Sequence, residues 1–505
     1  MTPDAETLAA KGDVKAQLEL GLAYAAGTAV PLDPDKAFYW LSLAATSNLP
    51  EALYNLGVCH FQGIGTVKNY PLAADLFEAA AKLDYPPAQH NLALCLMDGL
   101  GRPIELAQAV YWLKKAANNQ EPEAQWRLAE LYAQGSGVAP DPLETVKWLT
   151  LAAEQGLIPA QLALGSLYDL GQGVAPDPQK AFYWFLEAAK AGSPEAQVNV
   201  AFAYHWGRGT EKDRAAAFPW WVKAAEAGLS SAENALGSCY SLGQGTAVNP
   251  TLAVQWFQKA AAKGHPGAKF NLAVCLEKGL GVPEDPAQSF VLYHEAAQGG
   301  DPKAQAIVGR CLAQGWGTEK DPAKAVFWLE KSAQAGFAPA QFALGAHYAY
   351  GEGIDQDLSR AAHWFRKAAE DNLAEAQRAL GYCYKHGLGV GRDPIQALEW
   401  FTKAALADFP PAQMELGLCY AEGIDGHFRD LEKAYFWLEM AAKNQEPLAQ
   451  AFLDRSAYKT PPTSVTPNLK TSPADSSAPT KDPKWLQESV DKSLARARAL
   501  KEGLN

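Results

Sequence analysis

Long hydrophobic runs are missing from this 505-residue sequence, which nowhere contains eighteen successive uncharged apolar residues. A helix needs about 20 such residues to cross a bilayer, so no membrane insertion is predicted. The first residues also lack the basic and apolar regions of a secretory signal. A cytoplasmic location is therefore expected.

Positive charge is also scarce, because 44 Lys and Arg stand against 56 Asp and Glu and give a net charge of −12. Proteins that bind nucleic acid usually carry a basic face that neutralises phosphates. An acidic protein instead repels phosphates and anionic lipids. Nucleic acid is therefore not an expected partner.

Motifs that would assemble a catalytic or metal site are absent. His294-Glu295 lacks the second histidine of a zinc-protease helix, and the Gly-x-Gly loops, such as residues 351–353, lack the Lys-Ser/Thr of a phosphate loop. Cys311, His347 and Cys383 lie at 36-residue intervals. Ligands in three separate repeats cannot all reach one ion at about 2.0–2.3 Å. The sequence therefore predicts no enzyme, no metal and no cofactor.

The sequence does contain a 36-residue period. Ten of its fifteen tryptophans share one phase of this period, with one inserted residue before the last of them. Such regularity identifies a repeat architecture, and we predict that these tryptophans belong to the structural core of each repeat. They are Trp40, Trp112, Trp148, Trp184, Trp220, Trp256, Trp328, Trp364, Trp400 and Trp437.

Each repeat is predicted to be two helices joined by a turn. Alanine recurs every 36 residues from Ala16 to Ala412, and Ala16, Leu20 and Tyr24 form one helical stripe at i, i+4 and i+8. The glycine eleven residues after each alanine favours the positive φ that ends a helix. Asp33 and its mostly Asp or Asn equivalents are good N-caps for the second helix. The pattern completes twelve such units.

These residues resemble the Sel1-like repeat, a relative of the tetratricopeptide repeat. A representative unit reads AQLALGSLY at residues 160–168 and GQGV at 171–174. The resemblance covers residues 5–455, about nine tenths of the chain. It implies an all-α, right-handed α/α superhelical solenoid whose first helices line a concave groove, and a function as an adaptor or scaffold. One cysteine-rich branch of the family is secreted and linked to β-lactam binding or hydrolysis.

The cysteines occupy a single phase of the repeat, where other copies carry Ala, Leu or His. A position that accepts these residues is a small core site, where free cysteine is common. Equivalent helices of adjacent repeats lie about 8–10 Å apart, whereas a disulfide needs Cα atoms within roughly 7 Å. We therefore expect reduced thiols, which departs from the cysteine-rich branch and disfavours β-lactam chemistry. The residues are Cys59, Cys95, Cys239, Cys275, Cys311, Cys383 and Cys419.

The opposite stripe of the first helix contains positions 18, 22 and 25 of the first unit and their equivalents, here called the variable stripe. Its residues differ strongly between repeats, so the stack does not require them. We predict that it lines the groove and binds peptide segments or protein surfaces. Packing against the next repeat is the alternative for each aromatic residue, and a solvated surface charge is the alternative for each cation. The candidates are Tyr54, Phe61, Trp126, Phe202, Phe270, Phe342, Tyr382, Arg310, Arg378 and Lys385.

The period stops near residue 455. Residues 456–481 are rich in Pro, Ser and Thr and predict a disordered linker. Residues 482–505 open with the capping signature Asp482-Pro483 and predict an amphipathic C-terminal helix. This helix has three possible roles: capping the last repeat, docking within the groove of its own chain, or recruiting a partner.

The leading functional prediction is a scaffold or adaptor whose partners are other proteins or peptides. One alternative is a cell-envelope factor that binds peptidoglycan or polysaccharide. A β-lactam hydrolase of the cysteine-rich branch is the third and least favoured reading.

Overall fold

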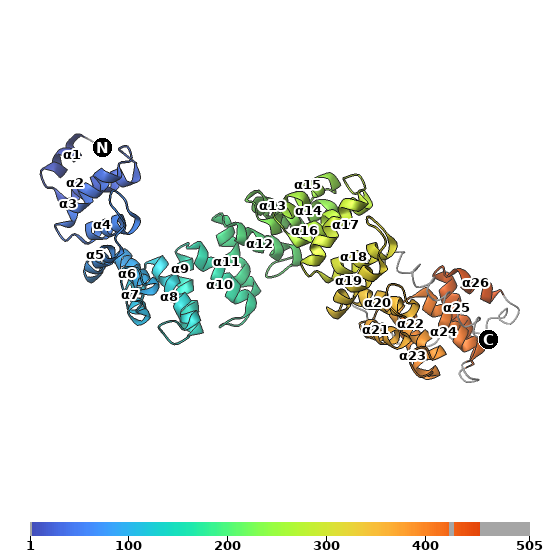
Figure 1. The fold of residues 1–505 in the computed structure, drawn as a ribbon. Coiled ribbons are helices and arrows are strands. Elements are labelled where there is room, and N and C mark those ends of the chain that lie inside the picture. Colours follow the sequence, from blue (N-terminus) through green and yellow to red (C-terminus); the bar gives the residue numbers. More distant parts are fainter. Residues whose placement is uncertain (1–2, 424–428, 455–505) are drawn as a thin grey trace. The chain divides into compact units, whose positions relative to one another are not determined.

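The computed structural model describes residues 3–423 and 429–454, and all regular secondary structure in these ranges is helical (Figure 1). Helix α1 (Pro3–Ala10) precedes the repeats and α26 (Pro447–Leu453) follows them. The predicted all-α solenoid is confirmed. The predicted linker 456–481 and C-terminal helix 482–505 lie outside the described residues.

Each repeat contributes a first helix and a second helix. The first helices are α2 (Val14–Ala26), α4 (Pro50–Gln62), α6 (Pro86–Asp98), α8 (Pro122–Gln134), α10 (Ile158–Leu170), α12 (Pro194–Trp206), α14 (Ser230–Leu242), α16 (Pro266–Lys278), α18 (Pro302–Gln314), α20 (Ala338–Tyr350), α22 (Ala374–His386) and α24 (Pro410–Glu422). The second helices are α3 (Pro34–Ala45), α5 (Tyr70–Lys82), α7 (Leu106–Asn118), α9 (Pro142–Glu154), α11 (Pro178–Lys190), α13 (Arg214–Glu226), α15 (Pro250–Ala262), α17 (Pro286–Gln298), α19 (Pro322–Gln334), α21 (Leu358–Glu370), α23 (Pro394–Leu406) and α25 (Leu431–Lys443).

The helices divide into two compact units, the first spanning Met1–Val248 and the second beginning at Asn249. Helices α1–α14 belong to the first unit and α15–α26 to the second. Within each unit, helices that are consecutive in the chain pack against one another. Each helix therefore contacts mainly its sequence neighbours, as in other repeat proteins.

The predicted helix boundaries follow from local chemistry. The Asp33 carboxylate accepts a hydrogen bond from the Lys36 N–H at 3.1 Å and caps α3. In all twelve repeats a residue two or three positions after the second helix takes a positive φ, whether it is Gly156 (86°) or Asn48 (58°). Short polar side chains tolerate this conformation better than other non-glycine residues.

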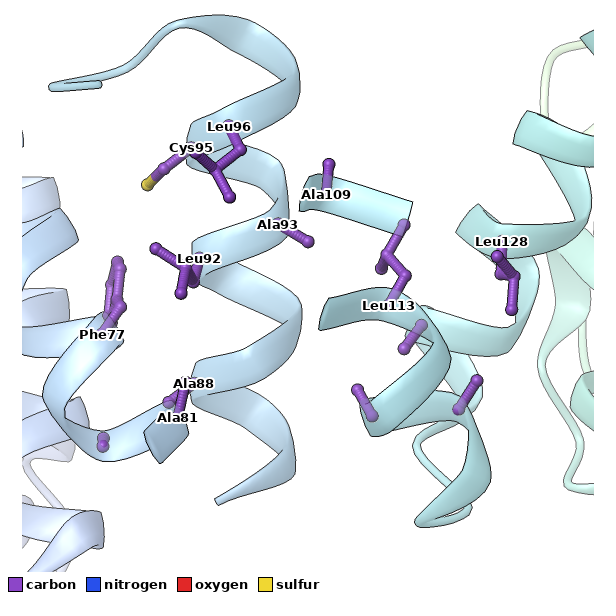
Figure 2. Close-up of a cluster of buried hydrophobic side chains, with 14 of the residues drawn as sticks. Phe77, Ala81, Ala88, Leu92, Ala93, Cys95, Leu96, Ala109, Leu113 and Leu128 are labelled. Atoms are coloured by element: carbon purple, nitrogen blue, oxygen red, sulfur yellow. The ribbon is translucent and has the colours of Figure 1, made fainter. Parts of the chain in front are cut away.

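The core is built around the residue that follows the tryptophan position of each repeat, which holds leucine in two repeats. This residue is buried in every repeat, and Phe185, for example, packs against Gly165 of the first helix. In Figure 2, Phe77 of α5 lies beside Leu92 of α6, and Ala93 of α6 faces Ala109 of α7. The series is Leu41, Phe77, Leu113, Leu149, Phe185, Trp221, Phe257, Tyr293, Leu329, Phe365, Phe401 and Leu438.

The tryptophans themselves lie at the edge of this core rather than at its centre. Trp148 and Trp328 are buried, whereas the other eight of the ten are half-buried. One residue along a helix is a rotation of about 100°, which turns the indole towards the rim. Lysine ammonium groups cover several of these rings, for example Lys259 at 3.9 Å from the Trp256 centroid. The position of a residue within the 36-residue period does not by itself tell whether it lies at the rim or at the centre of the core.

A side-chain bridge joins successive repeats. Gln125 Nε2 donates to the carbonyl oxygen of Ala117 at 3.0 Å, and Gln161 Nε2 donates to that of Ala153 at 3.1 Å. The same eight-residue link recurs with Gln17, Gln89, Gln197, Gln305, Gln341, Gln377 and Gln413 as donors. Each buried amide thus satisfies a carbonyl near the end of the preceding helix.

The second glycine of each Gly-x-Gly loop contacts the repeat before it. A Cβ atom on Gly209 would lie 2.0 Å from the carbonyl oxygen of Pro178, at the start of α11. No side chain fits at that distance. The loops therefore form a seam between repeats, in addition to ending the first helix.

Candidate partner-binding surface

The aromatic candidates of the variable stripe differ widely in exposure. Phe202 is 46% exposed, whereas Phe342 and Tyr382 are buried. Tyr54, Phe61, Trp126 and Phe270 are half-buried. Only part of the predicted stripe is therefore presented as aromatic surface.

Several of these rings pack onto other aromatic residues. Phe270 lies 5.4 Å from Tyr293 and Phe342 lies 5.5 Å from Phe365, measured between ring centroids, so both rest on the core residue of the second helix. Tyr54 contacts Tyr85 of the adjoining turn at 5.4 Å. Phe61 contacts Tyr70 at 5.2 Å. One side of each of these rings therefore packs within the solenoid, as the alternative to partner binding predicted.

The cationic candidates lie beside acidic groups of the chain. Arg310 Nη2 is 2.9 Å from Glu277 Oε1, and Lys385 Nζ is 3.5 Å from Glu415 Oε2. Burial alone would lower the pKa of Lys385, but Glu415, Cys419 and Glu422 together outweigh it, and the pKa is raised. Arg378 is only 5% exposed. Arg310 and Lys385 therefore form ion pairs within the chain, which a helical wheel cannot show because the acids come from neighbouring repeats.

A pocket of about 430 Å³ opens in the first unit, where helices α10, α11 and α12 meet. We call it the α10–α12 pocket. It presents exposed apolar side chains: Trp206 is 66% exposed and Leu170 is 63% exposed, beside Phe202. The full lining is Ser166, Asp169, Leu170, Pro178, Ala181, Phe182, Phe185, Asn199, Phe202, Ala203, Trp206 and Arg208.

The aromatic side chains of this pocket are held in place from behind. The Phe202 ring meets the fully buried Trp221 edge-on, with centroids 4.7 Å apart and an interplanar angle of 87°. The Trp206 indole meets the His205 ring at 4.8 Å. Such contacts fix ring orientation, and they leave the outer surfaces of Phe202 and Trp206 available.

Polar groups border the apolar surface. Arg208 Nε lies 2.8 Å from Asp169 Oδ1, and Arg208 Nη2 donates to the Asp169 carbonyl oxygen at 3.0 Å. This pair links the fifth and sixth repeats at the pocket. Ser166 and Asn199 add a hydroxyl and an amide. An apolar cavity with a few placed polar groups is the usual composition of a ligand-binding site.

The sequence reasoning identified Phe202 but missed Trp206 and Arg208. Trp206 lies outside the tryptophan phase, at a position equivalent to Ala26, Gln62 and Asp98. Other repeats carry Leu170, Leu242 or Tyr350 there. A tryptophan outside the tryptophan phase is the signal that would have marked it.

The cysteines, expected to be unpaired, are all free and buried. Burial raises the pKa of the Cys311 thiol to about 11, so its reactive thiolate form is suppressed at neutral pH. The His347 ring nitrogen Nδ1 lies 2.7 Å from the Glu352 carbonyl oxygen. In the part of the chain that the structure describes, no group of three or more His, Cys, Asp or Glu residues is arranged to hold a metal ion.

No helix among the described residues is long and apolar enough to cross a membrane.

The family model for the Sel1 repeat matches the chain twelve times in succession. The matched residues are 14–49, 50–85, 86–120, 122–157, 158–193, 194–229, 230–265, 266–301, 302–337, 338–373, 374–409 and 410–445. The chain belongs to the Sel1 repeat family. The predicted number of repeats and the predicted family are both confirmed.

Two solved structures resemble this Sel1 repeat protein. One is a protective antigen present in uropathogenic Escherichia coli strains, which displays an SLR fold; it is 30% identical, has a TM-score of 0.78, and the match covers 94% of this chain and 99% of that chain. The other is a Sel1 repeat protein from Oxalobacter formigenes, with 32% identity, a TM-score of 0.51, and coverage of 65% and 92%, respectively. No curated protein matches the chain. Sel1 repeat solenoids are generally non-catalytic and are typical of protein–protein interaction scaffolds.

Proposed function

We propose that this Sel1 repeat protein is an interaction scaffold and that the α10–α12 pocket receives an apolar anchor side chain of a partner peptide. The observation that carries the proposal is the exposure of Phe202 and Trp206 beside a cavity of about 430 Å³. Exposed aromatic surface next to a pocket is typical of binding hot spots.

The polar border indicates how such a peptide would be oriented. Asp169 and Arg208 lie side by side, and the Arg208 side chain is 58% exposed. A peptide with charged residues flanking its anchor can pair with either group. The net charge of −12 favours the approach of basic segments over acidic ones.

A peptide library displayed on phage and selected against the full chain tests the proposal. We expect selected peptides to share a large apolar residue and to lose at least tenfold in affinity on Phe202→Ala or Trp206→Ala. Truncation of a hot-spot residue costs about 2 kcal/mol or more, and tenfold corresponds to about 1.4 kcal/mol.

Tyr183→Ala is the matched control. Tyr183 belongs to α11 of the same unit and is 53% exposed, but it does not line the pocket. This variant should bind the selected peptides normally. Peptides that bind Phe202→Ala and Trp206→Ala chains as tightly as the parent chain would refute the assignment, provided that the melting temperatures match.

A further inference from the structure

Two first helices of the second unit, α22 and α24, are buried on more than one side. In α22 every residue from Glu375 to Cys383 is buried, and in α24 every residue from Pro411 to Gly417 is buried. A helix that packs through a single stripe leaves part of each turn exposed. Nine successive buried residues span about two and a half turns, so a second surface must be covered.

The exposure of equivalent positions in other repeats shows that the extra burial of α22 and α24 is not a general property of the repeat. Glu375 is 7% exposed, whereas its equivalents Glu123 and Glu195 are exposed. Glu415 is 2% exposed, whereas its equivalent Arg127 is half-buried. The covered surface, here called the α22–α24 face, comprises Glu375, Arg378, Tyr382, Met414 and Glu415.

The sequence neighbours of these helices do not account for the difference. Helix α22 packs between α21 and α23, and α24 packs between α23 and α25. Helix α8 packs in the same way between α7 and α9, yet Glu123 of α8 remains exposed. Contact between α22 and α24 themselves is slight by comparison.

The chemistry of the α22–α24 face defines its occupant. Tyr382 and Met414 offer apolar surface. Glu375 and Glu415 are buried carboxylates beside Arg378, and Lys385 lies 3.5 Å from Glu415. Buried charges are costly unless opposite charges and hydrogen bonds compensate them. A fitting occupant is therefore an amphipathic segment that covers the apolar surface and whose cations add to the pairing of the two carboxylates.

We propose that residues 482–505 of the same chain occupy the α22–α24 face. The described chain ends at Asp454 after α26, which packs on α25, which packs on α24. Two helix spacings amount to roughly 20 Å. The 27 residues numbered 455–481 span roughly 25–30 Å on average as a flexible chain, so the segment reaches the face.

The composition of this segment matches the face. Trp485, Leu486 and Val490 fall on one side of the predicted helix and suit Tyr382 and Met414. Residues 492–501 contain four cations and no Asp or Glu, which complements Glu375 and Glu415. The cations are Lys492, Arg496, Arg498 and Lys501.

The segment would then act as an internal pseudo-ligand. It withholds the variable stripe of α22 and α24 from other proteins until something displaces it. This regulation concerns the second unit and does not depend on the α10–α12 pocket of the first.

The experiment uses a labelled synthetic peptide of residues 482–505 and the full chain. In one variant, Trp485→Ala, Leu486→Ala and Val490→Ala are combined to weaken the attached segment. An attached segment competes at an effective concentration near the millimolar range. We therefore expect the peptide to bind the triple variant at least tenfold more tightly than the parent chain, measured by fluorescence anisotropy.

Glu375→Lys, added to the triple variant, tests the location of the site. Lys303 occupies the equivalent position of α18, so the repeat tolerates lysine there. We expect at least a tenfold loss of peptide binding, whereas Glu123→Lys at the equivalent exposed position of α8 should cause none.

Three outcomes would overturn the proposal. The peptide fails to bind the triple variant, or it binds the Glu375→Lys chain undiminished, or light scattering finds a dimer of the parent chain that the triple variant converts to monomers. The last result would assign the face to the C-terminal segment of a second copy. A failed phage selection at the α10–α12 pocket leaves all three measurements unaffected.

Discussion

Cysteine side chains in this protein are core groups rather than reactive ones. Burial raises the pKa of the Cys59, Cys95, Cys239 and Cys419 thiols to about 11, and that of Cys383 to about 12. At pH 8, a rise from the ordinary value of about 8.5 to about 11 lowers the thiolate fraction from roughly a quarter to roughly one in a thousand.

The native chain should therefore react with a disulfide reagent such as Ellman's reagent at least a hundredfold more slowly than a free thiol. In guanidinium chloride all seven cysteines should react rapidly, because unfolding removes the burial. Absorbance at pH 8 measures both rates. Rapid release from the folded chain would show that at least one thiol is accessible.

The same pKa values predict that the free energy of unfolding decreases at alkaline pH. A thiol whose pKa is raised by folding stabilises the native state fully below its unfolded pKa of about 8.5. That contribution is lost as the pH rises through about 11. Denaturant midpoints should accordingly fall between pH 9 and pH 11, in addition to any effect of lysine or tyrosine ionisation.

At the scale of elements, a first helix that carries the bridging glutamine is joined to the preceding repeat at two points. The glutamine bridge, such as Gln161 to Ala153, lies near its start, and the loop glycine, such as Gly209, lies beyond its end. Together they fix both ends of a helix of 13 residues.

Gly209→Ala should destabilise the first unit by more than its backbone conformation alone explains. A non-glycine residue in the left-handed region costs about 1–2 kcal/mol, and overpacking adds about 1–3 kcal/mol. Gly192→Ala is the control, since Gly192 also has a positive φ, of 97°, but a Cβ added there would meet no atom within 4 Å. Urea unfolding monitored by circular dichroism compares them, and equal losses would show that the loop contact is unimportant.

Much of this element-scale structure could be predicted from the sequence. The 36-residue period located the helices, Asp33 and its equivalents their starts, and the glycines their ends. The period could not separate Trp256 at the rim from Phe257 in the centre, because both phases are aromatic or large. It also could not show that Arg310 meets Glu277. The position of a residue in the repeat tells which side of its own helix it lies on, but not which side chains of the adjacent repeat it contacts.

At the scale of the whole molecule, stability should spread only between neighbours. Leu128 of α8 is fully buried, and its replacement by alanine should cost about 2–5 kcal/mol. In a repeat array each unit contacts mainly the next. Protection from hydrogen exchange should therefore fall most in α6–α10 and least in the second unit.

Hydrogen exchange measured by mass spectrometry tests this expectation. Leu143→Ala provides the control, because Leu143 lies in the same repeat but is 74% exposed. A uniform loss of protection across both units on Leu128→Ala would mean that the chain unfolds as one cooperative body.

The loop seam has a consequence for how this protein can change in length. Because Gly209 meets the carbonyl oxygen of Pro178 in the same way that Gly65 meets that of Pro34, the two sides of one joint match those of another. Removing one complete repeat would rejoin surfaces that already fit. A deletion of any other length would set a bulky residue against a backbone oxygen. Gene duplication and excision are thereby restricted to whole multiples of the repeat, which makes the size of the scaffold adjustable in discrete steps.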